Sequence, residues 1–406
     1  MWEQIRSNQI RSVVLVVAMA TVLLAVGYFI GLYFFGSGIA GLVIAIVIWV
    51  VMNLVAFFQG DRVLLALARA RKIERDDHPR LYNIVEEMKI ASGLEKMPDI
   101  YIIDDSALNA FATGRDSEHA AVAITSGLLQ KLNRDELQGV IGHEIAHIKN
   151  RDVMLMSLCS ILLGTIVILA WYATRIIFFQ SMFGGRRSSS SGGGGYGQII
   201  LLVVGIVLMI LAPLIAQLIY FAISRKREYL ADASSAQYTR YPEGLASALE
   251  KLGASTAQLQ SANQATAPMY IVNPFRKKGM AATDLSSTHP PLTERIRILR
   301  SMAGGASFAD YDKAYHQVHK GGKGFVIPAS ALAGGGTVGL RAAQPEAAPI
   351  GSEPSKLERT REVSDLMWRM NDYRTIDCDC GTRLKVPPKL KKAKIKCPHC
   401  GQTHQL

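Results

Sequence analysis

Four long uncharged stretches constrain this chain more than any other feature of its sequence. A transmembrane helix needs about 20 consecutive, predominantly apolar residues. Each of the four stretches holds at least 20 residues without an Asp, Glu, Lys or Arg; they are residues 13–35, 39–58, 153–174 and 199–223. We therefore expect a four-helix transmembrane region made of two hairpins.

The first hairpin is expected within residues 1–60, with spans at 13–35 and 39–58. The second is expected within residues 153–223, with spans at about 153–179 and 199–223. A cleaved signal peptide fits poorly, because the first apolar stretch is too long and a second span follows it at once. The second hairpin is expected to cross the bilayer. The alternative is a hairpin that does not fully cross it, because Arg175 lies near the end of one span and Pro213 inside the other.

Basic residues beside the spans predict how the chain is oriented. The 45 Lys and Arg residues outnumber the 33 Asp and Glu residues, which gives a net charge of +12. Many of them flank the spans, including Arg6, Arg11, Arg62 and the run at 225–227. Cytoplasmic flanks carry the excess of Lys and Arg in membrane proteins. We expect the N-terminus, the polar segments and the C-terminus to face the cytoplasm.

An HExxH motif, His143 to His147, lies on a predicted helix over residues 134–149. Asn133 and Glu136 have the spacing of a capping box at its start. Residues four apart share a helical face, so both imidazoles can bind one Zn²⁺, while Glu144 lies beside the open coordination position. A carboxylate there can take a proton from the water that attacks a peptide carbonyl and return it to the leaving amine. The alternative is a helix with two surface histidines.

A catalytic zinc site needs a third protein ligand. Metzincins supply a histidine after a glycine, but the corresponding positions here are Val153 and Asn150, which excludes that class. The other common solution is a glutamate on a later helix, and Glu228 follows the fourth span directly. Asp232 lies four residues further on the same helical face, where it can accept a hydrogen bond from the distal nitrogen of a ligating histidine. The alternative is a solvated acidic pair.

Taken together, four short segments resemble those of the HtpX-type membrane metalloproteases, relatives of the prenyl-protein proteases. The segments are 109–114, 143–147, 228–232 and 287–292. The resemblance reaches from the first span to about residue 300, and its specificity lies in the order of the segments. It implies a membrane-anchored zinc endopeptidase that faces the cytoplasm of a bacterial inner membrane and works in membrane-protein quality control and the stress response.

The resemblance also implies further site residues. The segment expected to form an edge strand that pairs with the substrate backbone is Asn109, Ala110, Phe111 and Ala112. The alternative role for Asn109 is to stabilise a turn. His289 matches a histidine that could donate a hydrogen bond to the oxyanion, or it belongs to a rigid Thr-His-Pro-Pro loop. Arg295 is a weaker candidate for the same work.

A cysteine cluster near the C-terminus predicts a second metal site. Its members are Cys378, Cys380, Cys397 and Cys400. Each pair ends in Gly, and in a reducing cytoplasm such pairs are more often metal ligands than disulfides. The segment resembles a zinc ribbon in which four thiolates hold a structural Zn²⁺. Because the first pair is CxC and not CxxC, His399 and His404 stay open as substitute ligands.

The ribbon is rich in lysine, and this leaves its partner open. Contact with anionic lipid or with protein is one reading, and a surface with no specific partner is another. Nucleic acid is not expected, because no aromatic residues are interleaved with the lysines.

These features predict an α+β zincin-type catalytic domain combined with the four-helix membrane region and a small ribbon. Strands are expected near residues 100–103 and 120–125. The remaining divisions are residues 61–152 and 224–319 for the two parts of the catalytic domain, 320–365 for a flexible linker and 366–406 for the ribbon.

The predicted function is zinc-dependent hydrolysis of peptide bonds in membrane or misfolded proteins at the cytoplasmic face. We expect one catalytic Zn²⁺ and one structural Zn²⁺, with protein substrates and the bilayer as partners. The alternative is a membrane scaffold or pseudoprotease that recruits partners through the ribbon. Glu144 argues against a scaffold, because a structural zinc needs no base. A prenyl-protein protease would differ in substrate and would be expected to carry more spans.

Overall fold

The structure is a computed structural model, and it describes most of the chain except the greater part of the expected second hairpin. The described residues are 2–157, 160–161, 164, 171–172, 175, 227–262, 266–274, 289–302, 304–319, 326–333, 336, 338–342, 354–388, 390 and 394–405. The third expected span therefore lies mostly, and the fourth wholly, outside the described residues.

A four-stranded mixed sheet underlies the catalytic domain. Its strands are β1 (Ala70–Ile73), β2 (Asp99–Ile103), β3 (Ala110–Gly114) and β4 (Ala120–Thr125), in the spatial order β1-β2-β4-β3. Strands β2 and β4 are parallel and the other pairs are antiparallel. The two strands expected from sequence are thus confirmed as β2 and β4. Strand β3 ends the sheet, so one of its edges is available to other segments.

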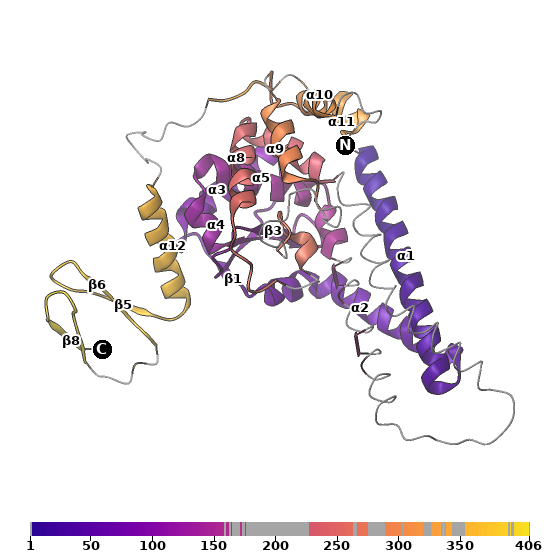
Figure 1. The fold of residues 1–406 in the computed structure, drawn as a ribbon, viewed down its shortest axis with the longest axis horizontal. Helices are drawn as coiled ribbons and strands as arrows, with labels where there is room; N and C mark the ends of the chain where they lie inside the picture. Colours follow the sequence, from indigo (N-terminus) through magenta and orange to yellow (C-terminus); the bar gives the residue numbers. More distant parts are fainter. Residues whose placement is uncertain are drawn as a thin grey trace.

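Helices from both sides of the second hairpin pack into one core (Figure 1). They are α3 (Pro79–Ser92), α4 (Ser126–Lys131), α5 (Arg134–Lys149), the helical residues 227–239, α8 (Pro242–Ala254), α9 (Leu292–Arg300) and α10 (Phe308–Val318). Ile84 of α3, Ile145 of α5 and Leu249 of α8 are fully buried in this core. Residues far apart in the sequence therefore fold as one unit around α5.

Helix α5 has the limits that its capping signals predict. The Asn133 side chain accepts a hydrogen bond from the Glu136 backbone N–H, and Glu136 accepts one from the Asn133 backbone N–H. These bonds satisfy backbone donors that an uncapped helix start would leave unpaired. Residues 135–148 are all buried, so the helix runs through the middle of the domain.

The N-terminal hairpin consists of α1 (Trp2–Phe35) and α2 (Gly38–Leu67). Among the described residues, one helix segment is long and apolar enough to cross a membrane, Gly38–Val55 of α2, with a mean hydropathy of 2.6. Only 17% of that segment is buried, and Val43, Val47 and Leu54 are exposed. Helix α2 then continues into the catalytic domain, where Leu64 and Leu65 are buried.

The segment expected to be a flexible linker, residues 320–365, is more ordered than its composition predicts. It contains α11 (Ala329–Ala333) and most of α12 (Lys356–Met370). Val363 and Leu366 of α12 are buried in the catalytic core. The composition of the whole segment is typical of a linker, but these apolar residues of α12 lie on one helical face and pack against the core.

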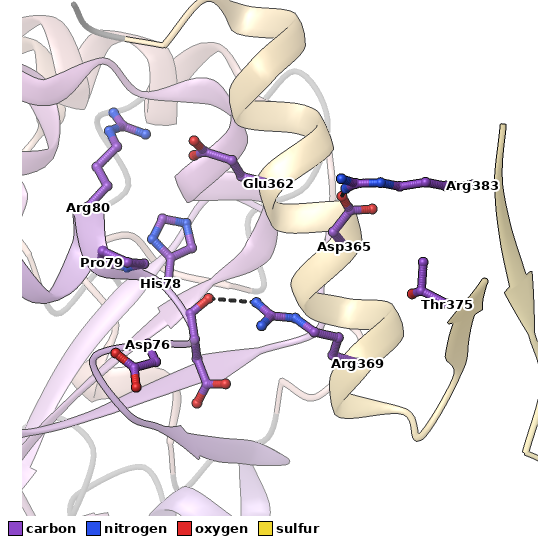
Figure 2. A pocket seen from close by; sticks show the side chains of 10 residues that line it. Asp76, His78, Pro79, Arg80, Glu362, Asp365, Arg369, Thr375 and Arg383 are labelled. Carbon is purple, nitrogen blue, oxygen red and sulfur yellow. Dashed lines mark hydrogen bonds and ion pairs between the residues drawn. The ribbon is translucent and has the colours of Figure 1, made fainter. Parts of the chain in front are cut away.

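Polar contacts also hold α12 on the catalytic domain. Figure 2 shows Arg369 of α12 donating to the backbone carbonyl of Asp77, just before α3, at 2.9 Å. The cavity drawn there lies between Asp76 to Arg80 on one side and residues of α12 with Thr375 and Arg383 on the other, and none of the candidate catalytic residues lines it. Beyond α12, the tail forms two hairpins, β5 (Arg374–Asp377) with β6 (Arg383–Val386) and β7 (Lys394–Lys396) with β8 (Thr403–Gln405).

Helices α5 and α8 approach so closely at Gly139 that a methyl group does not fit. A Cβ at Gly139 would lie 2.6 Å from the backbone nitrogen of Leu245 on α8. We expect Gly139→Ala to destabilise the protein by about 1–3 kcal/mol, the usual cost of overpacking. Gly253→Ala on α8 is the control, because its Cβ would meet only the Leu292 Cδ1 atom at 3.4 Å. Melting temperatures in detergent should fall for Gly139→Ala alone; equal melting temperatures would contradict this packing.

Candidate active site

Helix α5 carries the two candidate histidine ligands and the candidate base into the core. His143, Glu144 and His147 are each no more than 3% exposed. The Nε2 atoms of His143 and His147 lie 3.3 Å apart, with the two rings nearly perpendicular. Their four-residue spacing thus directs both imidazoles to one point, as the sequence predicts.

Glu228, on the helical residues 227–239, brings a carboxylate to the same point. Its Oε2 atom lies 3.4 Å from the His143 Nε2 atom, and its Oε1 atom lies 3.4 Å from the His147 Nε2 atom. One ligand atom from each of the three residues lies within 4.8 Å of the others. The structure therefore assembles the three ligands expected from sequence.

This donor set fits a zinc ion. Two imidazole nitrogens and a carboxylate oxygen are the ligands of many catalytic zinc sites. The Oε2 atom of Glu228 is buried and has no hydrogen-bond partner in the described part of the chain. Burial alone would raise the pKa of Glu228, but its interactions with His289, His143 and His147 hold it well below its usual value. Glu228 is thus ionised and able to bind a cation.

Asp232 and Arg295 lie behind His143. The Asp232 Oδ1 atom is 3.0 Å from the His143 Nδ1 atom. Arg295 donates to both Asp232 oxygens, from Nη2 at 2.6 Å and from Nε at 2.8 Å, and all three side chains are buried. Burial would lower the pKa of His143, yet hydrogen bonds to Asp232 and Glu228 outweigh it and raise the pKa. Arg295, a weak candidate on sequence, therefore contacts the site through Asp232, and also directly, because its Nη1 atom lies 3.5 Å from the Glu228 Oε2 atom.

Glu144 lies against the edge of the sheet. Its carboxylate accepts a hydrogen bond from the Ala112 backbone N–H in β3. Burial raises the pKa of Glu144 above its usual value, against the charges of His143 and His147, which lower it. The candidate base thus stands between the histidines and the strand expected to bind substrate.

In the segment Asn109 to Ala112, Ala110 begins β3 and Asn109 directly precedes it, but another part of the chain already contacts this segment. The Ile271 backbone N–H donates to the Ala110 carbonyl at 3.0 Å. The Asn109 side chain donates to the Val272 carbonyl at 2.8 Å and accepts from the Val272 N–H at 3.3 Å. Phe111 is fully buried against Tyr270, so its side chain packs in the core.

His289 lies beside Glu228, with its Nε2 atom 3.4 Å from the Glu228 Oε2 atom. Burial lowers the pKa of His289 to about 4, despite the opposing charge of Glu228. The ring is therefore neutral at pH 7 and can serve as a hydrogen-bond donor. Residues 275–288, which precede it, lie outside the described part of the chain.

Sequence reasoning missed Asp152. Its Oδ2 atom is 3.2 Å from the His147 Nδ1 atom, and its Oδ1 atom is 3.7 Å from the Arg227 Nε atom. Burial would lower the pKa of His147, but Asp152 and Glu228 raise it to about 10. An acidic residue five positions after the second histidine of HExxH is the signal that could have pointed to it.

The four tail cysteines gather between the two hairpins. The Cys378 and Cys400 sulfurs are 3.4 Å apart, the Cys380 and Cys397 sulfurs are 3.8 Å apart, and all four are free. One Sγ atom from each lies within 4.8 Å of the others. Gly381 and Gly401, which end the two pairs, have φ near +80°, as the tight turns of this arrangement require. The geometry supports four thiolates as the ligand set.

An HExxH helix whose histidines meet a glutamate from a later helix defines a zinc-dependent metalloprotease. Comparison with known proteins agrees with this class. Residues 75–303 match the family described as Peptidase family M48. The chain belongs to peptidase family M48.

Two curated relatives match a longer part of the chain than the family description does. The chain is 42% identical over 303 residues to a protease HtpX homolog of Thermoanaerobacter pseudethanolicus, which covers 74% of this chain and 98% of that protein. It is 43% identical over 302 residues to a protease HtpX homolog of Streptococcus agalactiae serotype III, which covers 74% and 100%. About a quarter of this chain has no counterpart in these relatives.

Among solved structures, the crystal structure of S. mikatae Ste24p matches with a TM-score of 0.39 and 21% identity, over 74% of this chain and 67% of that chain. The family and the curated relatives together show that the protein is a membrane-associated metalloprotease of the HtpX type.

Two arginines on α9 allow the buried part of this site to be tested. Arg295 is fully buried on Asp232, whereas Arg300 is 41% exposed on Glu243 and Glu250. Removing one partner of a buried ion pair costs about 3–5 kcal/mol, and an exposed pair contributes less than about 1 kcal/mol. We expect Arg295→Met to lower the melting temperature in detergent far more than Arg300→Met. Similar decreases for the two variants would show that Arg295 does not stabilise the site through Asp232.

Proposed function

We propose that this protein is a multi-pass zinc endopeptidase of the bacterial inner membrane that cleaves membrane or misfolded proteins at the cytoplasmic face, in membrane-protein quality control and the stress response. The observation that carries the proposal is the meeting of His143, His147 and Glu228 beside the buried Glu144, at the edge of β3. Ligands, base and substrate strand are needed together for peptide hydrolysis and have no joint use in a structural site.

The proposed roles follow from the positions of the side chains. The Nε2 atoms of His143 and His147 and the Glu228 carboxylate would hold Zn²⁺, which supplies a water of lowered pKa and polarises the scissile carbonyl. Glu144 takes a proton from the attacking water and passes it to the leaving amine. Asp232 holds the proton on the His143 Nδ1 atom, so that Nε2 keeps its lone pair. His289, neutral and close to Glu228, donates a hydrogen bond to the oxyanion.

We propose the outer edge of β3 as the substrate-binding strand. In an antiparallel pair, alternate residues direct both backbone groups to the same side. The Asn109 carbonyl bonds to Thr125 in β4, so the groups of Ala110 and Ala112 point outward. The Ala112 N–H reaches Glu144, which places this edge next to the proposed base. A substrate in extended conformation on this edge would present its backbone to Glu144.

Substrates in or near the membrane suit the position of the site. Helix α2 runs without interruption from its apolar segment to Leu65, which packs with Ala107 in the core that also contains Phe111 of β3. The active site is thus attached to the membrane hairpin by a rigid element. The second hairpin directly follows the end of α5, which supports a four-span arrangement with the catalytic domain, the N-terminus and the C-terminus in the cytoplasm.

Substituting the proposed base tests the activity. Glu144→Gln should bind as much zinc as wild type, because Glu144 is not a ligand, but should cleave an unfolded protein about 10²–10⁴-fold more slowly. Glu136→Gln is the control on the same helix, and it should weaken the helix cap while the folded protein keeps its activity. Zinc content and proteolysis are measured on detergent-purified protein. Zinc-loaded wild type that is inert towards every unfolded or membrane substrate would favour the scaffold.

We also propose that the tail cysteines hold a second, structural zinc and that the ribbon contacts lipid or a protein partner. Wild type should then contain two zinc ions per chain, one for each ligand group. Cys378→Ser combined with Cys397→Ser should lower the content to one, His143→Ala should also lower it to one, and all three changes together should lower it to none. Metal analysis of purified protein measures this; an unchanged content in the cysteine variant would exclude the ribbon site.

A further inference from the structure

Two matching triads of side chains surround the site. On one side, the His143 Nδ1 atom meets Asp232, which is held by Arg295. On the other, the His147 Nδ1 atom meets Asp152, which lies against Arg227. Asp152 and Arg227 are no more than 6% exposed.

We propose that Asp152 is a positioning residue for His147, held in place by Arg227, and that it sets the affinity of the site for its metal. This inference rests on the proposed zinc site. Asp152 meets the His147 ring at Nδ1, whereas Glu228 meets it at Nε2, so Asp152 acts through that ring and not on substrate.

The backbone is bent to bring Asp152 to this position. Five residues along a continuous α-helix lie about 140° around its axis, on a different face from His147. Helix α5 ends at Lys149, and Arg151 adopts φ +58°, a left-handed conformation that is uncommon for a residue other than glycine. The helix is interrupted there, and Asp152 begins the next helical segment with its carboxylate close to the His147 ring. Such outliers persist where the surrounding contacts require them.

The chemical reason is control of the tautomer. The proton of a neutral imidazole can lie on either nitrogen, and only the unprotonated one binds a metal. A carboxylate at Nδ1 keeps the proton there, so the Nε2 atom, which faces Glu228 at 3.4 Å, keeps its lone pair. The carboxylate also makes the ring a more basic ligand.

Arg227 adds a link between the two helices that carry the ligands. It directly precedes Glu228 in the sequence, and its Nε atom lies 3.7 Å from Asp152. The contact therefore links the helical residues 227–239 to the segment that follows α5. The contact between Asp152 and Arg227 therefore helps to set the distance between His147 and Glu228.

The experiment measures the rate at which a chromophoric chelator removes zinc from the full-length protein in detergent. Zinc can leave from the active site and from the ribbon in separate kinetic phases. The phase of zinc release that belongs to the active site is the one that His143→Ala abolishes. We expect zinc loss in this phase to be about 10–100-fold faster for Asp152→Asn, the usual effect of losing such a carboxylate. Asp152→Glu should recover part of the affinity. Asp135→Asn is the matched control, since Asp135 also pairs with an arginine, Arg341 at 2.6 Å, but at the opposite end of α5.

A purely structural role gives a different result. If Asp152 only stabilises the fold, Asp152→Asn will lower the melting temperature of the metal-free protein and lose zinc at the wild-type rate, which overturns the inference. The double variant Asp152→Asn with Arg227→Gln removes both buried charges and serves if the single variant does not fold; it should also lose zinc faster. If His143→Ala abolishes none of the phases of zinc release that the wild type shows, the proposed zinc site itself is refuted.

Discussion

Balance of buried charge is the constraint on which the rest of this structure depends. The buried charged groups of the site are Glu144, Asp152, Glu228, Asp232, Arg227 and Arg295. Their four carboxylates face two guanidinium groups and the rings of His143 and His147, whose pKa values are raised, so that opposite charges are matched in a region shielded from water, where unpaired charge is costly. A divalent cation held by Glu228 and the two imidazoles would replace the protons on those rings and keep this balance. The donor set and the charge balance are therefore both compatible with the same ion.

The packing of the domain serves this constraint. Three helical segments, α5, residues 227–239 and α9, each bring part of the charge cluster, and their order in the chain is interrupted by the second hairpin. They can meet only because their apolar faces share one core and because Gly139 lets α5 and α8 approach closely. The apolar surroundings lower the local dielectric, which strengthens each contact among Glu228, His143 and Asp232.

Local patterns predicted the parts of the site that depend on local geometry. The capping residues Asn133 and Glu136 define where α5 begins, and a four-residue spacing places His143 and His147 on one face. Contacts made across a break in a helix, or between segments far apart in the sequence, are not predicted by a local sequence pattern. Asp152 reaches His147 through the left-handed Arg151, and α12 packs on the core through an apolar stripe inside a segment whose composition is typical of a linker.

The same burial that organises the charges closes the site to a polypeptide. His143, Glu144, His147 and Glu228 are at most 3% exposed. In addition, Ile271 already bonds to Ala110 on the outer edge of β3. An extended substrate needs the backbone groups of that edge, and it can obtain them only after the segment around Ile271 has moved. Hydrolysis at this site therefore requires a rearrangement around β3, while the charge cluster on α5, being buried on every side, can stay as it is.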